Sequence, residues 1–184
     1  MTMPLPDPDN SWEDRYFPIA YLITFRTYGT WLHGDKRTSV RKKRRTPKES
    51  KIVSPNVPFE ASMREKMDQE SFLLDRTARN EVEIAMRELC KVRGYGLYAI
   101  NVRGNHVHVV IGVASKPERV ADALKAVATK RLRELGLISQ DRKVWSRGRS
   151  RRYLWKDSHV DGAIDYVLYG QGDLPFEIEG GEVD

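Results

Sequence analysis

The sequence predicts an α+β fold, in which an antiparallel sheet is backed by two helices and a further helix follows near the C-terminus. Three observations support this prediction. Short apolar, β-branched stretches alternate with two long segments of helical apolar spacing. Two of the strand candidates are separated by a three-residue polar turn, which is typical of a hairpin. The 184 residues suit a single domain with a real core.

The first strand is predicted at residues 19–27 (IAYLITFRT), because they are apolar and β-branched and Gly29 follows. The first helix is predicted at residues 75–92. Its apolar residues recur every three or four positions: Ala78, Val82, Ala85, Met86 and Leu89. The only cysteine, Cys90, lies in this helix and is interpreted as a core residue, and a single cysteine excludes an internal disulfide.

Two further strands are predicted at residues 97–102 and 106–113, joined by Arg103-Gly104-Asn105. Ser115 to Glu118 then has capping-box spacing and should begin a second helix, which Gly136 closes. The basic and aromatic residues 142–156 predict a last, broken strand, and residues 158–169 a short helix. The order is strand, helix, strand, strand, helix, strand, which is the ferredoxin-like (RRM-like) arrangement.

The domain organisation follows from composition. Residues 1–15 are expected to be a loose tail, residues 16–171 the domain, and residues 172–184 an acidic tail. Regular periodicity is missing between residues 30 and 74, which therefore predict a long loop inserted into the domain. Residues 36–51 in this loop hold nine basic side chains and one acidic one. They are either a solvated loop or an arm that contacts phosphates.

The charge of the chain favours an anionic partner. There are 32 basic and 26 acidic residues, a net charge of +6, and nucleic acid is the usual partner of such a protein. The N-terminus has no signal-peptide pattern, and no stretch is long and apolar enough for a membrane span. We therefore expect a cytoplasmic protein without a membrane partner.

The most specific local feature is the histidine pair in the stretch NHVHVVI. Side chains alternate across a strand, so His106 and His108 share one face while Val107 and Val109 point to the other. Two imidazoles in this arrangement can chelate one divalent metal ion. The pattern alone is weak, because two partly exposed sheet histidines would look the same. Its place in a hairpin of a ferredoxin-like order strengthens the metal interpretation.

The last predicted helix carries two tyrosines. Val160, Ala163, Ile164, Val167 and Leu168 form its apolar stripe. Tyr166 lies well away from the centre of that stripe and Tyr169 lies nearly opposite, so neither is forced into the core. Both could face a site.

With these motifs the chain resembles the HUH-type (His-hydrophobic-His) single-tyrosine transposases, and within them the REP-associated tyrosine transposases. The resemblance spans roughly residues 16–171 and rests on YLITFRTYGTWL, NHVHVVI, the approach from Arg151 to Trp155, and AIDYV. It implies that His106 and His108 hold Mg²⁺ or Mn²⁺ and that Tyr166 attacks single-stranded DNA beside a hairpin. The products would be a 5′-phosphotyrosine and a free 3′-hydroxyl, and rejoining would complete DNA transposition. Tyr169 remains the alternative nucleophile.

The family often has a third metal ligand, Gln or Asn, four residues after the tyrosine. Here that residue is Gly170, which has no ligand atom, so Gln171 is the candidate instead. Phosphate contacts are expected from two basic groups: Lys42, Lys43, Arg44 and Arg45 in the loop, and Arg147, Arg149, Arg151 and Arg152 before the last helix. Lys125 and Lys130 could add to them. Trp145 and Trp155 could stack on bases or belong to the core.

Other functions share parts of this pattern. A non-catalytic RRM-like module would bind nucleic acid on exposed aromatics of the central strands. A replication or mobilisation initiator would use the same histidine pair in a larger protein. A domesticated enzyme would nick host hairpins without moving itself, with the same catalytic residues. Sequence leaves open a homodimer or a monomer, and whether the tyrosine helix serves its own subunit's histidines or a partner's.

Overall fold

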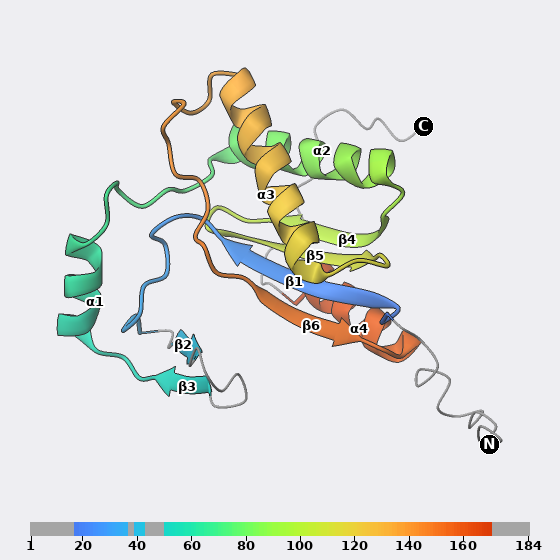
Figure 1. Cartoon of the computed structure of the whole chain (residues 1–184), viewed down its shortest axis with the longest axis horizontal. Helices are drawn as coiled ribbons and strands as arrows, with labels where there is room; N and C mark the ends of the chain where they lie inside the picture. Colours follow the sequence, from blue (N-terminus) through green and yellow to red (C-terminus); the bar gives the residue numbers. More distant parts are fainter. Residues whose placement is uncertain (1–16, 37–38, 43–49, 171–184) are drawn as a thin grey trace, which may run out of the picture.

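The structure is a computed structural model that describes residues 17–36, 39–42 and 50–170. Within these residues, an antiparallel four-stranded sheet has the order β4-β5-β1-β6 (Figure 1). Its strands are β1 (Ala20–Arg26), β4 (Gly96–Val102), β5 (His106–Gly112) and β6 (Ser150–Leu154). Helix α2 (Arg76–Arg93) precedes β4, and helix α3 (Pro117–Glu134) links β5 to β6. The predicted ferredoxin-like α+β fold is confirmed.

The two faces of the sheet pack against different helices. Alternate residues of β1 and β5 form the main core with α2 and α3: Tyr21, Ile23, Phe25, Val107, Val109 and Ile111. The remaining positions face α4 (Asp157–Leu168), which lies on the opposite side of the sheet (Figure 1). Val160, Ala163 and Val167 of α4 pack there against Ala99, Val110 and Leu154. Helix α4 is therefore held on the same face as the even-numbered residues of β5.

The helix ends follow local chemistry, with one departure from the sequence prediction. Helix α2 begins at Asp75, whose Oδ1 accepts a hydrogen bond from the Ala78 amide at 2.7 Å, and ends at Gly94 with a φ of 65°. The capping box predicted at Ser115 is wrong. Lys116 is the N-cap of α3, without a side-chain capping bond. Pro117 takes the first helical position, and it holds the residue before it in the extended conformation.

The region between residues 30 and 74 is not one long loop. Strands β2 (Ser39–Lys42) and β3 (Ser50–Val53) pair antiparallel, and α1 (Val57–Glu65) follows. The prediction of irregular structure is wrong here because α1 buries none of its residues, so it has no apolar stripe to detect. Its start was nevertheless encoded locally. Asn56 accepts a hydrogen bond from the Phe59 amide at 2.9 Å, and Pro58 lies in the first turn.

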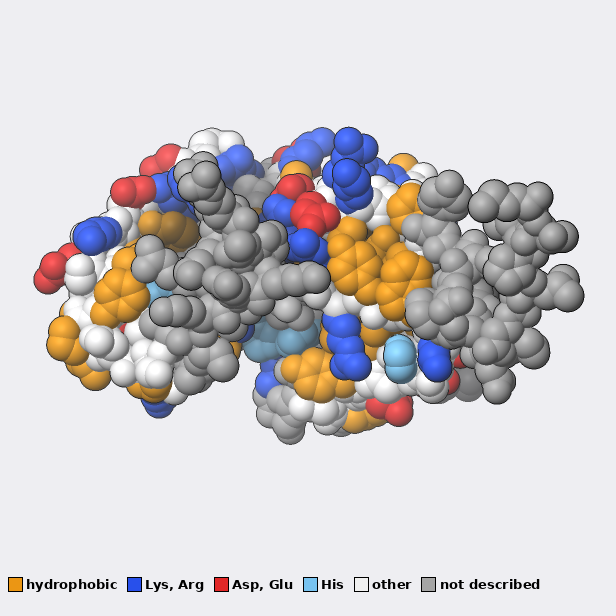
Figure 2. Space-filling model, turned by 60° about the horizontal axis from the view of Figure 1, so that its bottom comes forward, with side chains coloured by type: hydrophobic (Ala, Val, Ile, Leu, Met, Phe, Trp, Pro, Cys, Tyr) orange, Lys and Arg blue, Asp and Glu red, His pale blue; other side chains and the backbone are white. Residues whose placement is uncertain are grey.

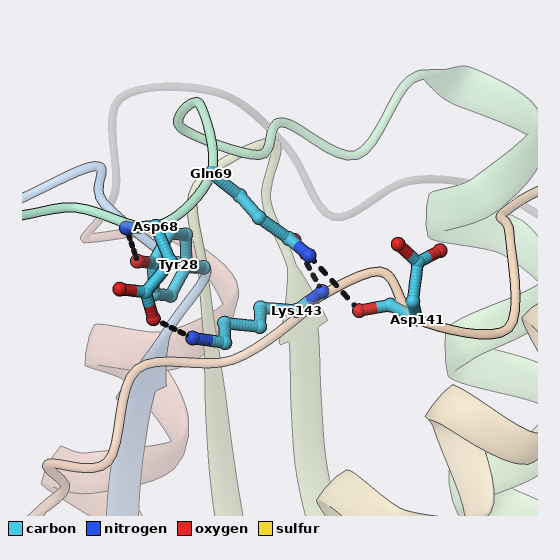
Figure 3. A network of polar contacts seen from close by, with 5 residues as sticks. All are labelled: Tyr28, Asp68, Gln69, Asp141 and Lys143. Carbon is cyan, nitrogen blue, oxygen red and sulfur yellow. Dashed lines mark hydrogen bonds and ion pairs between the residues drawn. The ribbon is translucent and has the colours of Figure 1, made fainter.

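A polar network fastens the end of this insertion to the segment that leads into β6 (Figure 3). The Gln69 side chain donates to the Asp141 carbonyl at 3.0 Å and accepts from the Lys143 amide at 2.8 Å. The Lys143 ammonium pairs with Asp68 and lowers the pKa of its carboxyl group. The Asp68 amide donates to the Tyr28 hydroxyl at 3.2 Å. The basic segment before β6 therefore starts from a fixed point beside the end of β1.

Cys90 is buried in the core formed with α2, as expected. Within the part of the chain that the structure describes, no helix has both the length and the apolar character needed to cross a bilayer.

Candidate active site

The histidine pair lies on β5, one of the two central strands, and faces α4. In the sheet His106 is opposite Arg26 of β1, and His108 is opposite Thr24. The ring centroids of His106 and His108 are 4.6 Å apart, with the ring planes at 84°. Val107, between them, is fully buried on the other face. The alternation predicted from sequence is confirmed, and it brings the two imidazoles into contact.

Each imidazole has a polar partner at Nδ1. His106 Nδ1 lies 2.6 Å from Asn105 Oδ1, and His108 Nδ1 lies 2.7 Å from Thr24 Oγ1. An amide oxygen only accepts hydrogen bonds, so with this amide orientation Nδ1 of His106 donates, and in the neutral ring Nε2 carries the lone pair. The Asn105 carbonyl in turn accepts a hydrogen bond from the Thr27 amide at 2.9 Å. The end of β1 thus helps to hold the residue that orients His106.

These residues fit two ligands of a divalent metal ion. Histidines that bind metals usually give one ring nitrogen to a polar neighbour and the other to the metal, and Asn105 and Thr24 are such neighbours. Among the described residues, no group of three His, Cys, Asp or Glu side chains is close enough together to hold a metal. The candidate third ligand, Gln171, lies outside the described residues. The described chain therefore offers two imidazoles as candidate ligands.

Tyr166 completes the cluster from α4. Its ring meets the His108 ring edge to face, with centroids 5.6 Å apart and planes at 82°. The side chain is 45% exposed, so it borders both His108 and solvent. Tyr169 is the C-cap residue of α4 and is 68% exposed. Both tyrosines avoid the core as expected, and Tyr166 is the one in ring contact with the histidine pair.

The predicted phosphate-contacting residues are spread over both sides of the sheet. Arg152 is exposed, and by alternation it shares the face of the histidines. Arg151 points to the α3 side, where its Nε lies 3.0 Å from Glu118. Arg149 pairs with Asp122 of α3 at 2.6 Å, and Arg147 is exposed in the loop. Lys43, Arg44 and Arg45 lie outside the described residues, and Lys42 is described only as the last residue of β2.

The aromatic residues of the same segment separate into two kinds. Trp145 packs edge to face on Phe25, with centroids 5.1 Å apart, and its Nε1 donates to the Lys125 carbonyl at 3.1 Å. Trp145 is therefore mainly a packing residue. The rings of Tyr153 and Trp155 are parallel within 11° at 6.5 Å, and Tyr153 is 43% exposed. On the face seen in Figure 2, histidine side chains have hydrophobic and basic side chains beside them.

Lys125, expected to be a phosphate contact, is buried instead. Its ammonium donates to the carbonyls of Ser146, at 2.8 Å, and Gly148, at 3.1 Å. Burial and, to a smaller extent, the nearby Arg149 guanidinium together lower its pKa to about 8. Lys125 shapes the loop before β6 rather than facing a ligand.

The residues that support the site carry little signal in the sequence. Thr24 and Asn105 hold the histidines, and Asn101 of β4, opposite His108 in the sheet, is buried beneath α4. A weak signal existed for two of them. Asn101 is a polar residue within the apolar stretch YAINV, and Thr24 alternates onto the polar side of LITFR. Their roles depend on the pairing of strands, which the sequence does not state.

The fold and the site together define the class of protein: a ferredoxin-like α+β domain with a histidine pair and a helix-borne tyrosine on one face of its sheet. A model of the IS200-like transposase family matches residues 66–164, which is more than half of the 184 residues. The chain belongs to this family of transposases. The matched segment includes both histidines and ends two residues before Tyr166. No curated protein gives a significant match.

Solved structures of similar proteins include two transposases. One is a REP-associated tyrosine transposase bound to a REP hairpin, with 11% identity over 85% of this chain and 69% of that chain, and a TM-score of 0.47. The other is described as a transposase from Deinococcus radiodurans R1, with 13% identity over 86% of this chain and 94% of that chain, and a TM-score of 0.46.

Proposed function

We propose that this transposase cleaves and rejoins single-stranded DNA through Tyr166, with a divalent metal ion held by His106 and His108. The observation that carries the proposal is the unbroken contact from one imidazole to the next and on to the phenol ring, with centroid distances of 4.6 and 5.6 Å. Metal-assisted attack by a hydroxyl needs candidate metal ligands next to an accessible hydroxyl, and these three side chains have that arrangement. Membership in a transposase family makes DNA the substrate class.

The reaction assigned to Tyr166 is a transfer of the phosphodiester. The phenol loses its proton, and its oxygen forms a bond to phosphorus as the bond between phosphorus and the 3′ oxygen breaks. The 3′ oxygen takes a proton and leaves as a 3′-hydroxyl, and the 5′ end stays on the enzyme as a phosphotyrosine. Because this ester keeps the energy of the broken bond, a 3′-hydroxyl can reverse the step and join strands without ATP.

The metal would be Mg²⁺ or Mn²⁺, and when bound it would draw negative charge from the scissile phosphate. The chain's own residues prepare the site for it. Asn105 and Thr24 fix the orientation of the two rings, so little is left to be ordered when the ligands bind. Tyr166 borders solvent, which leaves a path for a DNA strand to reach its hydroxyl.

We propose that the single strand runs along β6, the edge strand next to β1. Exposed Arg152 on the histidine face and exposed Arg147 in the preceding loop would contact phosphates. On the α3 side of β6, which it shares with Arg151, the exposed ring of Tyr153, parallel to Trp155, would stack on a base where the DNA strand crosses this edge of the sheet. Arg149 and Arg151 are engaged by Asp122 and Glu118, so they would contribute less than the sequence suggests. The remaining candidate contacts are Lys42, Lys43, Arg44 and Arg45 of the inserted region.

The test mixes the purified protein with Mg²⁺ or Mn²⁺ and a single-stranded hairpin DNA from the flanks of its gene. A covalent protein–DNA adduct is expected, and it should disappear in Tyr166→Phe and persist in Tyr169→Phe. Loss of the adduct in Tyr169→Phe alone would move the nucleophile to that residue. Equal cleavage in the presence of EDTA would refute the metal assignment, and so would undiminished cleavage by the double variant His106→Ala, His108→Ala.

A non-catalytic RRM-like module is less well supported by the geometry. That function needs exposed aromatic residues on the central strands. The aromatic residues of β1, Tyr21 and Phe25, are 2% and 1% exposed and pack beneath α2 and α3. On the other face the central strands present Thr24, Arg26 and the histidines instead. A domesticated hairpin nickase would use the same site, and the difference would appear as cleavage without strand joining.

A further inference from the structure

Asn101 of β4 is a buried polar residue that the proposed chemistry does not use. It is 1% exposed and lies opposite His108 in the pairing of β4 with β5. Its side-chain nitrogen Nδ2 donates a hydrogen bond to the Val167 carbonyl of α4 at 2.8 Å. Its Oδ1 is buried and has no hydrogen-bond partner among the described residues. One amide thus spans from the histidine-bearing part of the sheet to the residue that follows Tyr166.

The bond from Asn101 caps the end of α4. The last four carbonyls of a helix have no partner within the helix. In α4 the amides of Tyr169 and Gly170 both donate hydrogen bonds to the Asp165 carbonyl. The Gly170 amide also donates to the Tyr166 carbonyl. Val167 is fully buried, so its carbonyl cannot turn to water while the last turn stays on the sheet. Among the described residues, Asn101 supplies the hydrogen bond that this carbonyl requires.

Apolar packing alone does not explain an asparagine at this position. The unsatisfied Oδ1 of the buried amide has a desolvation cost that an apolar side chain would not have, and the bond from Nδ2 to the Val167 carbonyl offsets that cost. The neighbouring contacts of α4 are apolar: Ala99, Val110 and Leu154 pack on Val160 and Ala163. An apolar residue at position 101 would continue this surface, but it would give the last turn no bond that fixes its position. The asparagine at this position therefore indicates that the last turn of α4 has to be held in one position on the sheet.

We propose that Asn101 is a positioning residue that fastens the last turn of α4 to the sheet, so that Tyr166 stands against His108 of its own chain. The inference rests on the proposed function, because the turn it holds carries the proposed nucleophile. Without the bond, the buried Val167 carbonyl is satisfied most easily if the turn moves away from the sheet into water. That movement takes the Tyr166 ring away from His108.

The test uses two variants of the full chain. Asn101→Leu keeps the approximate shape and removes the donor, and Asn101→Ser keeps a polar group whose shorter side chain no longer reaches Val167. The first readout is the nuclear Overhauser effect between the rings of His108 and Tyr166, which requires no DNA. The second is the rate of adduct formation at saturating hairpin DNA, measured beside the Kd for the same DNA.

We expect both variants to lose the ring-to-ring signal and to form adduct about 10²-fold more slowly, with the Kd unchanged. A matched control is Thr129→Val of α3, which removes bonds to the Lys125 carbonyl and from Trp145 on the other face of the sheet. It should lower stability while leaving signal and rate unchanged.

Retention of the ring signal in either folded variant, or a normal rate despite its loss, would overturn the proposal. If the wild-type protein forms no adduct, the proposed function fails, while the ring signal still decides the role of Asn101. If Asn101→Leu does not fold, Asn101→Ser decides, because a smaller residue adds no new contact to accommodate.

Discussion

Replacing Gly170 by alanine tests how closely the end of α4 fits around Tyr166. The Gly170 amide donates to the carbonyls of Asp165, at 3.2 Å, and Tyr166, at 3.1 Å, so Gly170 lies close against the tyrosine. A Cβ atom at position 170 would lie 2.9 Å from the Tyr166 carbonyl oxygen and 3.0 Å from its Cα. It would also lie 3.1 Å from Cδ2 of the ring. Two of these atoms are backbone, so the helix end itself has to move.

The size of the effect follows from these distances. Cβ contacts below 3.0 Å essentially do not occur, so Tyr166 must shift by some tenths of an ångström. Overpacking of this kind costs about 1–3 kcal/mol of stability. A misplacement of 1 Å at a reacting group can cost 10²-fold in rate, so we expect Gly170→Ala to slow adduct formation by about tenfold.

Gly162 provides the matched control because it lies in the same helix and a Cβ there would meet nothing within 4 Å. Gly162→Ala should raise the free energy of unfolding by about 0.5–1 kcal/mol and leave the adduct rate unchanged. The assay pairs single-turnover adduct formation with urea unfolding of both variants. Equal rates for Gly170→Ala and wild type would refute the reasoning. A Gly170→Gln variant that forms adduct faster than wild type would refute it as well. Glutamine restores the ligand type of the family, but it carries the same Cβ as alanine and should therefore be slowed.

Three further changes test other parts of the molecule. Thr24→Val removes the hydroxyl beside His108 Nδ1, so Mn²⁺ affinity measured by calorimetry should fall by about 10–100-fold, and an unchanged affinity would contradict that role. Tyr153→Leu should weaken single-stranded DNA binding by about 1–3 kcal/mol. The control is Tyr98→Leu, which should not weaken it, because Tyr98 is 48% exposed but lies on β4, the opposite edge strand. Equal losses of binding in the two variants would argue against stacking at β6. Because burial lowers the pKa of Lys125 to about 8 in the folded chain, the folded state loses this proton before the unfolded state does. Urea unfolding should therefore show wild type gaining about 1–2 kcal/mol relative to Lys125→Met between about pH 8 and pH 9.5, and a constant difference would exclude the shift.

The parts of the fold that the sequence predicted are those whose packing leaves a periodic pattern. The residues of β1, β5, α2 and α3 form the core, and their apolar spacing exists because they pack there. Helix α1 and the β2–β3 hairpin lacked such a pattern, and α1 indeed buries no residue. The predicted start of α3 was one residue too early. The capping-box spacing indicated Ser115 as the N-cap, but Pro117 takes the first helical position, which makes Lys116 the N-cap.

The candidate site shows the same division between local and long-range information. Alternation along one strand was enough to put His106 and His108 on one face, and helical spacing was enough to keep Tyr166 out of the core. The supporting residues depend on which strands are neighbours. Thr24 supports His108 only because β1 lies beside β5, and Asn101 lies opposite it only because β4 is on the other side. No spacing within the sequence encodes those two pairings.

These supports divide the site into two halves that should respond differently to mutation. The histidines lie on a central strand, and their partners Thr24 and Asn105 belong to the sheet and its hairpin turn. The tyrosine lies on a helix held to the sheet by apolar packing and by the bond from Asn101. Changes in the sheet half should therefore lower metal affinity, whereas changes at Asn101 or Gly170 should lower the reaction rate and leave metal affinity unchanged. If a variant of Asn101 or Gly170 weakened metal binding as strongly as Thr24→Val does, the two halves of the site would not be independent.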